Sequence, residues 1–251
     1  MDQPEWDLYL QQFENLDHTH FTKIPKYTTK YCVMIEPRTH PKLIPVIKNF
    51  MYLLQKHGWG LIIFHGTENE SYLHNKLKNW KNVGYVQMNV ENLNTEEYNN
   101  VLMSTSFWET LEQVGCKHAL IFQTDTLLLK SNIDDFLIYD YVGAPWFMKF
   151  FGVLEVGNGG LSLRKVETMK MLTQKYPKMP INEDAWFAYM LLEEKKVNPQ
   201  INIPTLESAK RFAVETIFYE DPCGLHKPHM DKLKCSREEF VQLLRARHVP
   251  I

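Results

Sequence analysis

The chain has 251 residues, 44% of them hydrophobic and 23% charged, which is the composition of a globular protein with one large domain or two small ones. The formal net charge of -2 argues against a general attraction to nucleic acid or to an anionic membrane. No stretch approaches the roughly 20 apolar residues that a transmembrane helix needs, so we expect no membrane span.

The cysteines and the N-terminal residues bear on the compartment. Four cysteines in a chain of this length do not resemble a disulfide framework and suggest a reducing compartment. The first five residues are acidic and polar and contain no apolar signal core. From these features we expect a soluble, cytoplasmic protein.

Residues 5–16 carry apolar side chains at helical spacing, namely Trp6, Tyr9, Leu10, Phe13 and Leu16. The pattern predicts a helix that lies against the main domain, although a helix that binds a partner protein would have the same pattern. A polar stretch, 17–30, follows it. We therefore predict residues 1–30 as an N-terminal helix and linker, and residues 31–251 as a single domain.

Strand and helix patterns alternate from residue 31 onward. Short apolar runs rich in β-formers predict strands at 31–35, 61–64, 83–88 and 118–122. Helical spacing predicts helices from about Pro45 to Gly58, from 105 to 114, and from a capping box at Ser236. The alternation indicates an α/β fold with a mostly parallel central sheet flanked by helices. In such sheets the ligand site lies outside the carboxyl ends of the strands.

The fourth predicted strand is followed by the polar residues Gln123, Thr124 and Asp125, which lie between two strongly apolar runs. A carboxylate in this position can hold a divalent metal that bridges a diphosphate. Asp is also a favoured residue at the start of a turn, and from this segment alone both interpretations stay open.

A glycine-rich segment, Gly157-Asn158-Gly159-Gly160, follows a short strand that ends in a turn at Trp146. The glycines permit a close approach of the backbone to a ligand, but a plain hairpin loop has the same composition. The alternation Leu-Ser-Leu-Arg over 161–164 predicts an edge or half-buried strand.

Two acids open a later helix. Asn182 fits as the N-cap of a helix that continues to about Leu192, and Glu183 and Asp184 occupy its first turn. Acids in the first turn favour the helix dipole, which explains both residues without any function and keeps them ionised at neutral pH. A helix start that faces a ligand crevice is also a natural place for a catalytic base.

The last candidate segment is a loop that contains Cys223, His226, Lys227 and His229. With Cys235 it has the ligand types of a structural zinc site, but the spacing matches no common zinc module. A plain surface loop and a loop that supplies one imidazole to a metal held elsewhere are the alternatives.

The order of these motifs resembles that of glycosyltransferases with the GT-A fold, from about Tyr31 to His229. It is most similar to a poorly characterised branch of that superfamily whose Asp-x-Asp metal motif reads Gln-Thr-Asp. The resemblance implies a Rossmann-like sheet with a smaller, acceptor-side lobe after about Tyr141. It also implies that the protein is an enzyme, most similar to the hexosyltransferases.

The resemblance assigns roles to individual residues. Asp125 would be the last acid of the metal motif, and Mn²⁺ or Mg²⁺ would be held by Asp125 and by His226 or His229. Asp184 would be the catalytic base, with Glu183 beside it. The residues that would contact the nucleotide-sugar are Pro37, Arg38, Thr39, Gln123, Thr124, Asp125, Trp146, Gly157, Asn158, Gly159, Gly160 and Lys227.

The predicted function is transfer of a sugar, with inversion, from a nucleotide-diphosphate sugar such as a UDP-sugar to a glycan, protein or small-molecule acceptor. Gln123 departs from the motif, because a neutral amide leaves the metal with one charge fewer. This departure is the best argument for the first alternative, a non-catalytic nucleotide-sugar or carbohydrate-binding protein, whereas the intact Asp184 and the paired histidines argue against it. The second is a metal-dependent phosphoesterase, which generally needs a denser cluster of acids and histidines. The sequence leaves the oligomeric state open.

Overall fold

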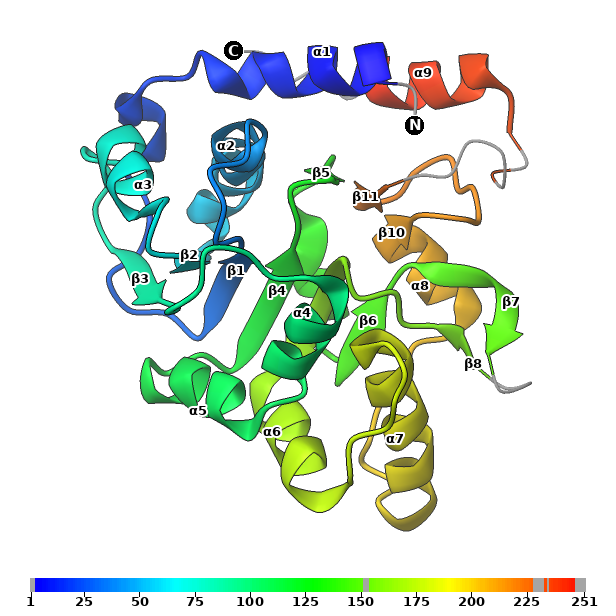
Figure 1. Cartoon of the computed structure of the whole chain (residues 1–251). Helices are drawn as coiled ribbons and strands as arrows, with labels where there is room; N and C mark the ends of the chain where they lie inside the picture. The colour runs from blue at the N-terminus through cyan, green and yellow to red at the C-terminus, as the bar shows by residue number, and fades with distance from the viewer. Residues whose placement is uncertain (1–2, 151–153, 228–232, 234, 247–251) are drawn as a thin grey trace.

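The computed structural model describes residues 3–150, 154–227, 233 and 235–246, which fold into an α/β architecture (Figure 1). Six of the described strands form the main sheet, in the order β3-β2-β1-β4-β9-β6. Their bounds are Lys30–Ile35 (β1), Gly60–His65 (β2), Val83–Gln87 (β3), His118–Phe122 (β4), Tyr141–Gly143 (β6) and Leu161–Lys165 (β9). The strands β3, β2, β1 and β4 are parallel to one another, whereas β9 runs antiparallel to both of its neighbours. The sheet is therefore mostly parallel, as predicted.

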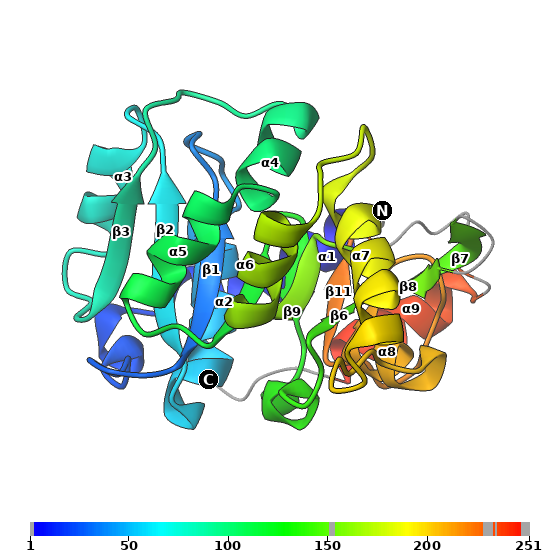
Figure 2. The same ribbon diagram turned by 90° about the horizontal axis from the view of Figure 1, so that it is seen from below.

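Helices cover both faces of the main sheet (Figure 2). The core on one face includes side chains of α1 (Gln3–Glu14), α2 (Leu43–Leu54) and α3 (Glu70–Lys76). The core on the other face includes side chains of α4 (Thr95–Leu102), α5 (Thr105–Gln113), α6 (Val166–Lys175) and α7 (Glu183–Val197). Along β1, Cys32 and Met34 belong to the first core, whereas Val33 and Ile35 belong to the second. Because alternate side chains of a strand point to opposite faces, a strand buried on both faces needs a continuous apolar run.

Strand β9 corrects one sequence prediction. It lies between β4 and β6 instead of at an edge, and its polar side chains Ser162 and Arg164 are fully buried. Arg164 forms an ion pair with Glu183, and the Ser162 hydroxyl donates to the Gly159 carbonyl at 3.0 Å. The polar positions of this strand are thus buried groups with partners, which the alternation alone does not distinguish from a solvated face.

Two small sheets lie beside the main sheet (Figure 1). One has the order β10-β11-β5, and the other pairs β7 with β8. Their bounds are Thr126–Leu128 (β5), Pro145–Phe150 (β7), Leu154–Val156 (β8), Ala213–Val214 (β10) and Gly224–His226 (β11). Antiparallel pairing of β11 with β5 sets His226 opposite Thr126. The late loop is therefore held next to the Gln-Thr-Asp segment.

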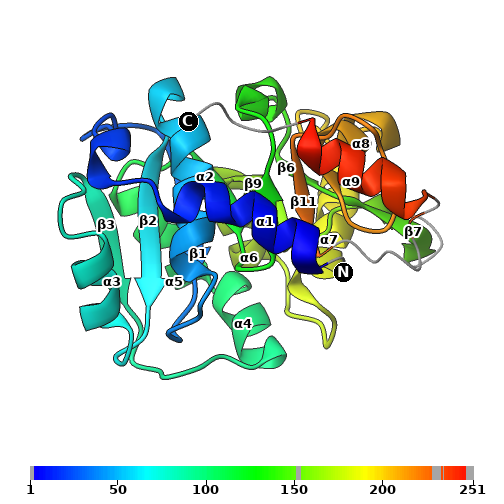
Figure 3. The ribbon, with the colours of Figure 1, turned by 90° about the horizontal axis from the view of Figure 1, so that it is seen from above.

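The helices at the two ends of the chain lie next to each other (Figure 1, Figure 3). Helix α1 packs against α2 and α9 (Arg237–Arg245), and the Tyr9 hydroxyl donates to the Leu128 carbonyl at 3.1 Å. Nothing in these contacts tests the predicted boundary at residue 30, which stays a prediction. In the part of the chain that the structure describes, no helix is long and apolar enough to cross a membrane.

Helix boundaries follow local chemistry where caps are present. The predicted capping box at Ser236 is formed, and Gly115, after α5, has a φ of 79°. Helix α2 begins two residues before Pro45, because a proline in the first turn has no amide that needs a partner. The remaining helical elements are α8 (Leu206–Phe212), η1 (His18–Phe21), η2 (Gln55–His57) and η3 (Asn132–Phe136).

Candidate active site

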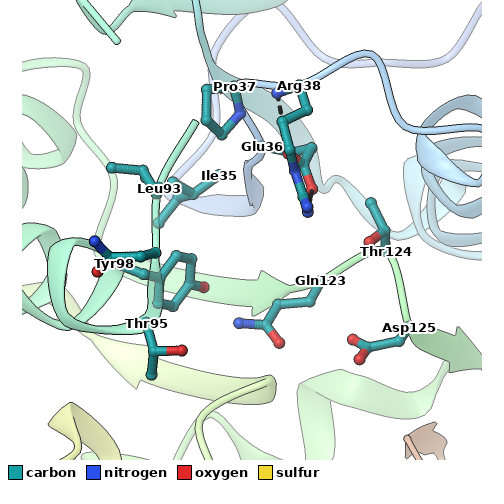
Figure 4. Close-up of a pocket in the computed structure, with 11 residues that line it drawn as sticks. Ile35, Glu36, Pro37, Arg38, Leu93, Thr95, Tyr98, Gln123, Thr124 and Asp125 are labelled. Atoms are coloured by element: carbon teal, nitrogen blue, oxygen red, sulfur yellow. Dashed lines mark hydrogen bonds and ion pairs between the residues drawn. The ribbon is translucent and has the colours of Figure 1, made fainter. Parts of the chain in front are cut away.

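The strand order of the main sheet reverses between β1 and β4. After β1 the chain adds β2 and β3 on one side and then returns to add β4 on the other. Open α/β sheets bind ligands outside the carboxyl ends of their strands at such a point. A cavity of about 300 Å³ lies there, formed by the ends of β1 and β4 and the start of α4 (Figure 4). It is lined by Ile35, Glu36, Pro37, Arg38, Leu93, Asn94, Thr95, Tyr98, Gln123, Thr124 and Asp125.

On the β1 side of the cavity, a buried carboxylate orients an exposed guanidinium. Glu36 is buried, and its two oxygens accept hydrogen bonds of 2.8 Å from Nε and Nη2 of Arg38. Hydrogen bonding to Glu36 raises the pKa of Arg38 above its usual value. A bidentate pair of this kind has a fixed geometry, so the Arg38 donors are held at the cavity wall. Pro37 is buried beside them, whereas Thr39 is exposed and does not line the cavity.

On the α4 side, the Tyr98 hydroxyl is buried and has no hydrogen-bond partner among the described residues. Burial raises the pKa of this phenol well above its usual value. Its oxygen lies on the side of the ring that faces Gln123 (Figure 4). Because an unpaired buried hydroxyl costs about 1–3 kcal/mol, a ligand that hydrogen-bonds to Tyr98 would gain that amount.

At the end of β4, Asp125 lies beside His226, whose imidazole ring stands between the carboxylates of Asp125 and Glu215. Asp125 Oδ1 is 3.6 Å from His226 Nε2, and His226 Nδ1 is 3.5 Å from Glu215 Oε1. Burial lowers the pKa of His226, but the two carboxylates outweigh burial and raise it to about 9. Burial likewise raises the pKa of Asp125, but His226 and Lys227 outweigh it and hold the pKa below its usual value. In this arrangement the imidazole is protonated at neutral pH.

The Asp125 and His226 pair is suited to a shared metal rather than to a metal held by protein alone. Asp125 Oδ1 and His226 Nδ1 are buried, and in the described part of the chain they make ion-pair contacts of 3.6 and 3.5 Å but no hydrogen bond. Within that part, no group of three or more His, Cys, Asp or Glu residues could hold a metal ion. A carboxylate and one further ligand, completed by substrate phosphates and water, is the usual way in which Mg²⁺ is bound beside nucleotides. The residues therefore fit a metal that arrives with a diphosphate.

The glycine segment 157–160 lies against these groups. A Cβ at Gly160 would overlap the His226 ring, and a Cβ at Gly159 would overlap the Glu183 carboxylate. Gly157 has a φ of 130°, and a Cβ there would contact Ala188 at 3.1 Å. Glycine is therefore required by the close approach of side chains from β11 and α7, which is more than a hairpin turn alone would need.

Glu183, at the start of α7, is engaged in a buried ion pair. Its carboxylate accepts from both terminal nitrogens of Arg164, at 2.6 and 2.8 Å. The guanidinium also lies over the rings of Tyr141 and Phe187, with centroid distances of 4.8 and 5.4 Å. The counter-charge raises the pKa of Arg164 above its usual value despite its burial. Both Glu183 oxygens are thus committed to Arg164.

Asp184, the next residue, points to the glycine segment instead. Its Oδ2 accepts from Gly159 N at 3.1 Å, and its Oδ1 accepts from Ala185 N at 2.7 Å. Burial and the neighbouring Glu183 raise the pKa of Asp184 to about 6. The helix start does not lower the pKa here, because burial outweighs it. A pKa of about 6 still leaves most of the carboxyl groups ionised at pH 7, and it is suited to a general base.

The other residues of the predicted site have different environments. Trp146 is buried close to Gly157, and Asn158 Oδ1 accepts from Gly160 N at 3.1 Å. Lys227 is exposed, and its amide donates to the Asp125 carbonyl at 2.9 Å. His229, and with it one ligand of the alternative zinc site, lies outside the described residues. Cys223, another ligand of that alternative, donates to Asn132 Oδ1 at 3.2 Å.

Four residues at the site escaped the sequence analysis: Glu36, Tyr98, Arg164 and Glu215. Glu36 directly follows an apolar strand, so the same strand-end rule that selected Asp125 could have selected it. Glu215 follows β10, which is only two residues long and leaves no readable strand pattern. Arg164 is hidden within an alternating pattern, and nothing in the sequence around Tyr98 indicates that it faces a cavity.

Comparison with known proteins gives one family and distant structural likenesses. Residues 82–226 match a family described as protein of unknown function (DUF5672). No protein of curated function matches the sequence. One similar structure is a glycosyltransferase involved in the glycosylation of the major capsid of PBCV-1; it is 13% identical, with a TM-score of 0.43, covering 86% of this chain and 99% of the other.

A second similar structure is a mannosyltransferase from Pyrobaculum calidifontis in complex with GDP-Man and Mn²⁺. It is 9% identical, with a TM-score of 0.47, and the match covers 80% of this chain but only 63% of that protein's chain. At these identities and TM-scores, neither structure assigns a role to any residue of this chain.

Proposed function

We propose that this chain, which belongs to the family of proteins of unknown function DUF5672, transfers a sugar from a nucleotide-diphosphate sugar to an acceptor hydroxyl. The observation that carries the proposal is the double contact of the glycine segment. Gly160 lies against His226, next to Asp125, and the Gly159 amide binds the Asp184 carboxylate. One short segment therefore joins a candidate diphosphate site to a candidate base.

The donor nucleotide, for which we propose UDP, would occupy the cavity at the ends of β1 and β4. A volume of about 300 Å³ is at the lower end of the range of small-molecule sites. The oriented Arg38 guanidinium and the unpartnered Tyr98 hydroxyl supply donors at opposite walls. Gln123 lines that cavity together with Asp125, and there its amide can bond the ribose instead of a metal.

Asp125 and His226 would hold the diphosphate end of the donor together with a divalent cation, for which we propose Mn²⁺ or Mg²⁺. When bound, the cation would neutralise charge on the leaving diphosphate. His226 must then be neutral, so binding of the cation would release the proton that the two carboxylates hold there.

Asp184 is the residue that we propose as the general base. The acceptor oxygen attacks the anomeric carbon, and the bond from that carbon to the diphosphate oxygen breaks. The bonding electron pair leaves with the diphosphate, and the acceptor proton passes to Asp184. Glu183 cannot share this task while Arg164 occupies both of its oxygens. Attack from the face opposite the diphosphate would invert the anomeric configuration.

The test is incubation with a panel of UDP- and GDP-sugars and candidate acceptors, with Mn²⁺ or with EDTA, followed by analysis of the products. We expect a glycosylated acceptor with inverted configuration by NMR of the anomeric proton. Release of nucleotide without glycosylation would indicate a phosphoesterase or hydrolase, and nucleotide binding without any product would indicate a binding protein. A retained configuration would exclude Asp184 as the base of a direct displacement.

Two variants separate binding from chemistry. Asp184→Asn keeps the side-chain shape and removes the base, so turnover should fall at least about a hundredfold while donor affinity survives. Asp125→Ala should remove most of the gain in UDP affinity that Mn²⁺ provides, measured by calorimetry with and without EDTA. Asp135→Asn, in η3, is the matched control: the neighbouring Asp134 pairs with Lys30 at the start of β1, the end of that strand opposite to the cavity, and the Asp135 carboxylate accepts a hydrogen bond from Asn132. Near-normal turnover of Asp184→Asn would contradict the proposed base.

A further inference from the structure

Helix α4 contacts both the donor cavity and the start of α7, where the proposed base Asp184 lies. Thr95 and Tyr98 line the cavity, and the helix begins with a capping box between Asn94 and Glu97. The residue that follows Tyr98 is Asn99, which points about 100° further around the helix. Its side chain reaches the start of α7, where Asp184 lies. Neighbouring residues of one short helix thus contact two different parts of the site.

The start of α7 is capped from α4. Asn182 occupies the N-cap position of α7, but its side chain makes no capping hydrogen bond. Asn99 Oδ1 accepts from Glu183 N at 3.2 Å, and Asn99 Nδ2 donates to Asn182 Oδ1 at 3.3 Å. The first amides of a helix have no partner within the helix, and a side-chain oxygen usually supplied by the N-cap residue satisfies one of them. Here another helix supplies it.

This contact is one of three that hold the first turn of α7. Arg164 holds the Glu183 carboxylate, Gly159 N holds the Asp184 carboxylate, and Asn99 holds the Glu183 amide. The first two come from β9 and the segment before it. Only the Asn99 contact, among these three, comes from an element that also lines the donor cavity.

We propose that Asn99 is a positioning residue that couples occupation of the donor cavity to the placement of the Asp184 carboxylate. A nucleotide that bonds the Tyr98 hydroxyl restrains α4. Because Asn99 ties α4 to the first amide of α7, the same nucleotide restrains Asp184. The inference rests on the proposed role of Asp184 as the base: Gly159 and Ala185 already hold its carboxylate, and a bound donor would add a further restraint through α4.

A purely structural cap would behave differently. It would lower the stability of the protein when removed, but nucleotide binding would not change the dynamics of α7. The coupling is therefore measured directly, as hydrogen exchange of the Glu183 amide by NMR, in the presence and absence of UDP and Mn²⁺. In the unchanged protein we expect the nucleotide to slow this exchange by about five- to tenfold, the range that one hydrogen bond supports.

Three variants test the proposal on the full chain. Asn99→Ala should bind UDP with unchanged affinity by calorimetry, yet nucleotide should no longer slow exchange of the Glu183 amide. Asn99→Asp keeps an oxygen that can accept from Glu183 N and should restore the slowing. Asn100→Ala is the matched control, because it makes the same change at the next, exposed residue of α4.

Kinetics give the second readout. Asn99→Ala should lower kcat for transfer about ten- to a hundredfold with the donor KM within about twofold, because small displacements of a catalytic group have effects of this size. Asn100→Ala should leave both parameters unchanged. The coupling would be overturned if UDP still slowed exchange of the Glu183 amide in Asn99→Ala. It would also be overturned if bound UDP did not slow this exchange in the unchanged protein. Failure of the unchanged protein to transfer any sugar would instead overturn the proposed function, and the exchange experiment would still decide the coupling.

Discussion

Around Asp125 several buried polar atoms make no hydrogen bond within the described residues, whereas at the start of α7 the carboxylates are hydrogen-bonded. In the described part of the chain, the Tyr98 hydroxyl is buried without a hydrogen-bond partner, and Asp125 Oδ1 and His226 Nδ1 make only the longer ion-pair contacts of 3.6 and 3.5 Å. At α7, Glu183 is bound by Arg164, and Asp184 accepts from two backbone amides. The first region has the character of a binding site that a ligand completes, and the second that of a preorganised catalytic geometry. The variants below test this contrast, because each removes or displaces a group in one of the two regions.

The largest effect on stability is expected when one partner of the buried ion pair between Arg164 and Glu183 is removed. Arg164→Met leaves the Glu183 carboxylate buried and unpaired, so the free energy of unfolding should fall by about 3–5 kcal/mol, measured by urea denaturation. Arg164→Met combined with Glu183→Gln removes both charges and should recover a large part of that loss. Lys196→Met removes an exposed partner of Glu193 and should have no measurable effect. A small loss in Arg164→Met would mean that the pair does not organise this region.

The next effect concerns the pH dependence of Asp184. Its pKa rises from 3.8 to about 6 in the folded protein, so the fold holds a proton that the unfolded chain releases at lower pH. The stability from this group is fully present below about pH 4 and is lost as the pH rises through about 6. Asp184→Asn should therefore be more stable than the unchanged protein above pH 6, by up to about 3 kcal/mol.

The titration of Asp184 should also appear in the catalytic rate, which should rise with pH where the stability falls. The base must be deprotonated, so kcat/KM should rise with pH and level off above about 6. The charged and titratable groups that act on Asp184 are Glu183, Arg164 and Tyr141. A rate that is independent of pH between 5 and 7, as determined by initial-rate measurements, would contradict the assignment.

A smaller effect is expected at the contact between the two regions. In Gly160→Ala the added Cβ would overlap the His226 ring, so the ring must shift from its position beside Asp125. The stability should fall by about 1–3 kcal/mol, and the UDP affinity in the presence of Mn²⁺ should fall with it. In Gly115→Ala the added Cβ would have no atom within 4 Å, although the φ of 79° at this position is unfavourable for alanine. That control should lower stability without changing the UDP affinity in calorimetry.

The smallest effect should come from the open hydroxyl of Tyr98. Tyr98→Phe removes an unpaired buried group, so the melting temperature should stay the same or rise slightly. The variant loses a hydrogen bond only when the nucleotide is bound, so the UDP affinity should fall about fivefold. Unchanged affinity would show that the nucleotide does not use this hydroxyl.

Local chemistry determined most of the predicted elements. The predicted strand 118–122 is β4 to the residue, and its four buried positions, 119–122, are all apolar, because a strand buried on both faces needs a continuous apolar run. The capping box at Ser236 and the glycine stop at Gly115 are contacts within a few residues of the chain, and both are present. Helix α4 escaped prediction, because its exposed polar residues leave too weak an apolar stripe to read.

The site itself depends on contacts between distant parts of the sequence. The strand-end rule selected Asp125, and the resemblance added His226 and Asp184, but neither indicated Glu215 beside His226 or Arg164 across from Glu183. Arg164, whose alternating strand looked half-buried from its sequence, decided which of the two adjacent acids is committed to a buried ion pair. A local pattern records which side of an element is apolar, whereas the partner of a buried charge is set by the packing of separate strands and helices. For this protein, sequence therefore determined the sheet and its ligand-binding edge, and only tertiary structure decided which polar groups there are paired and which remain open.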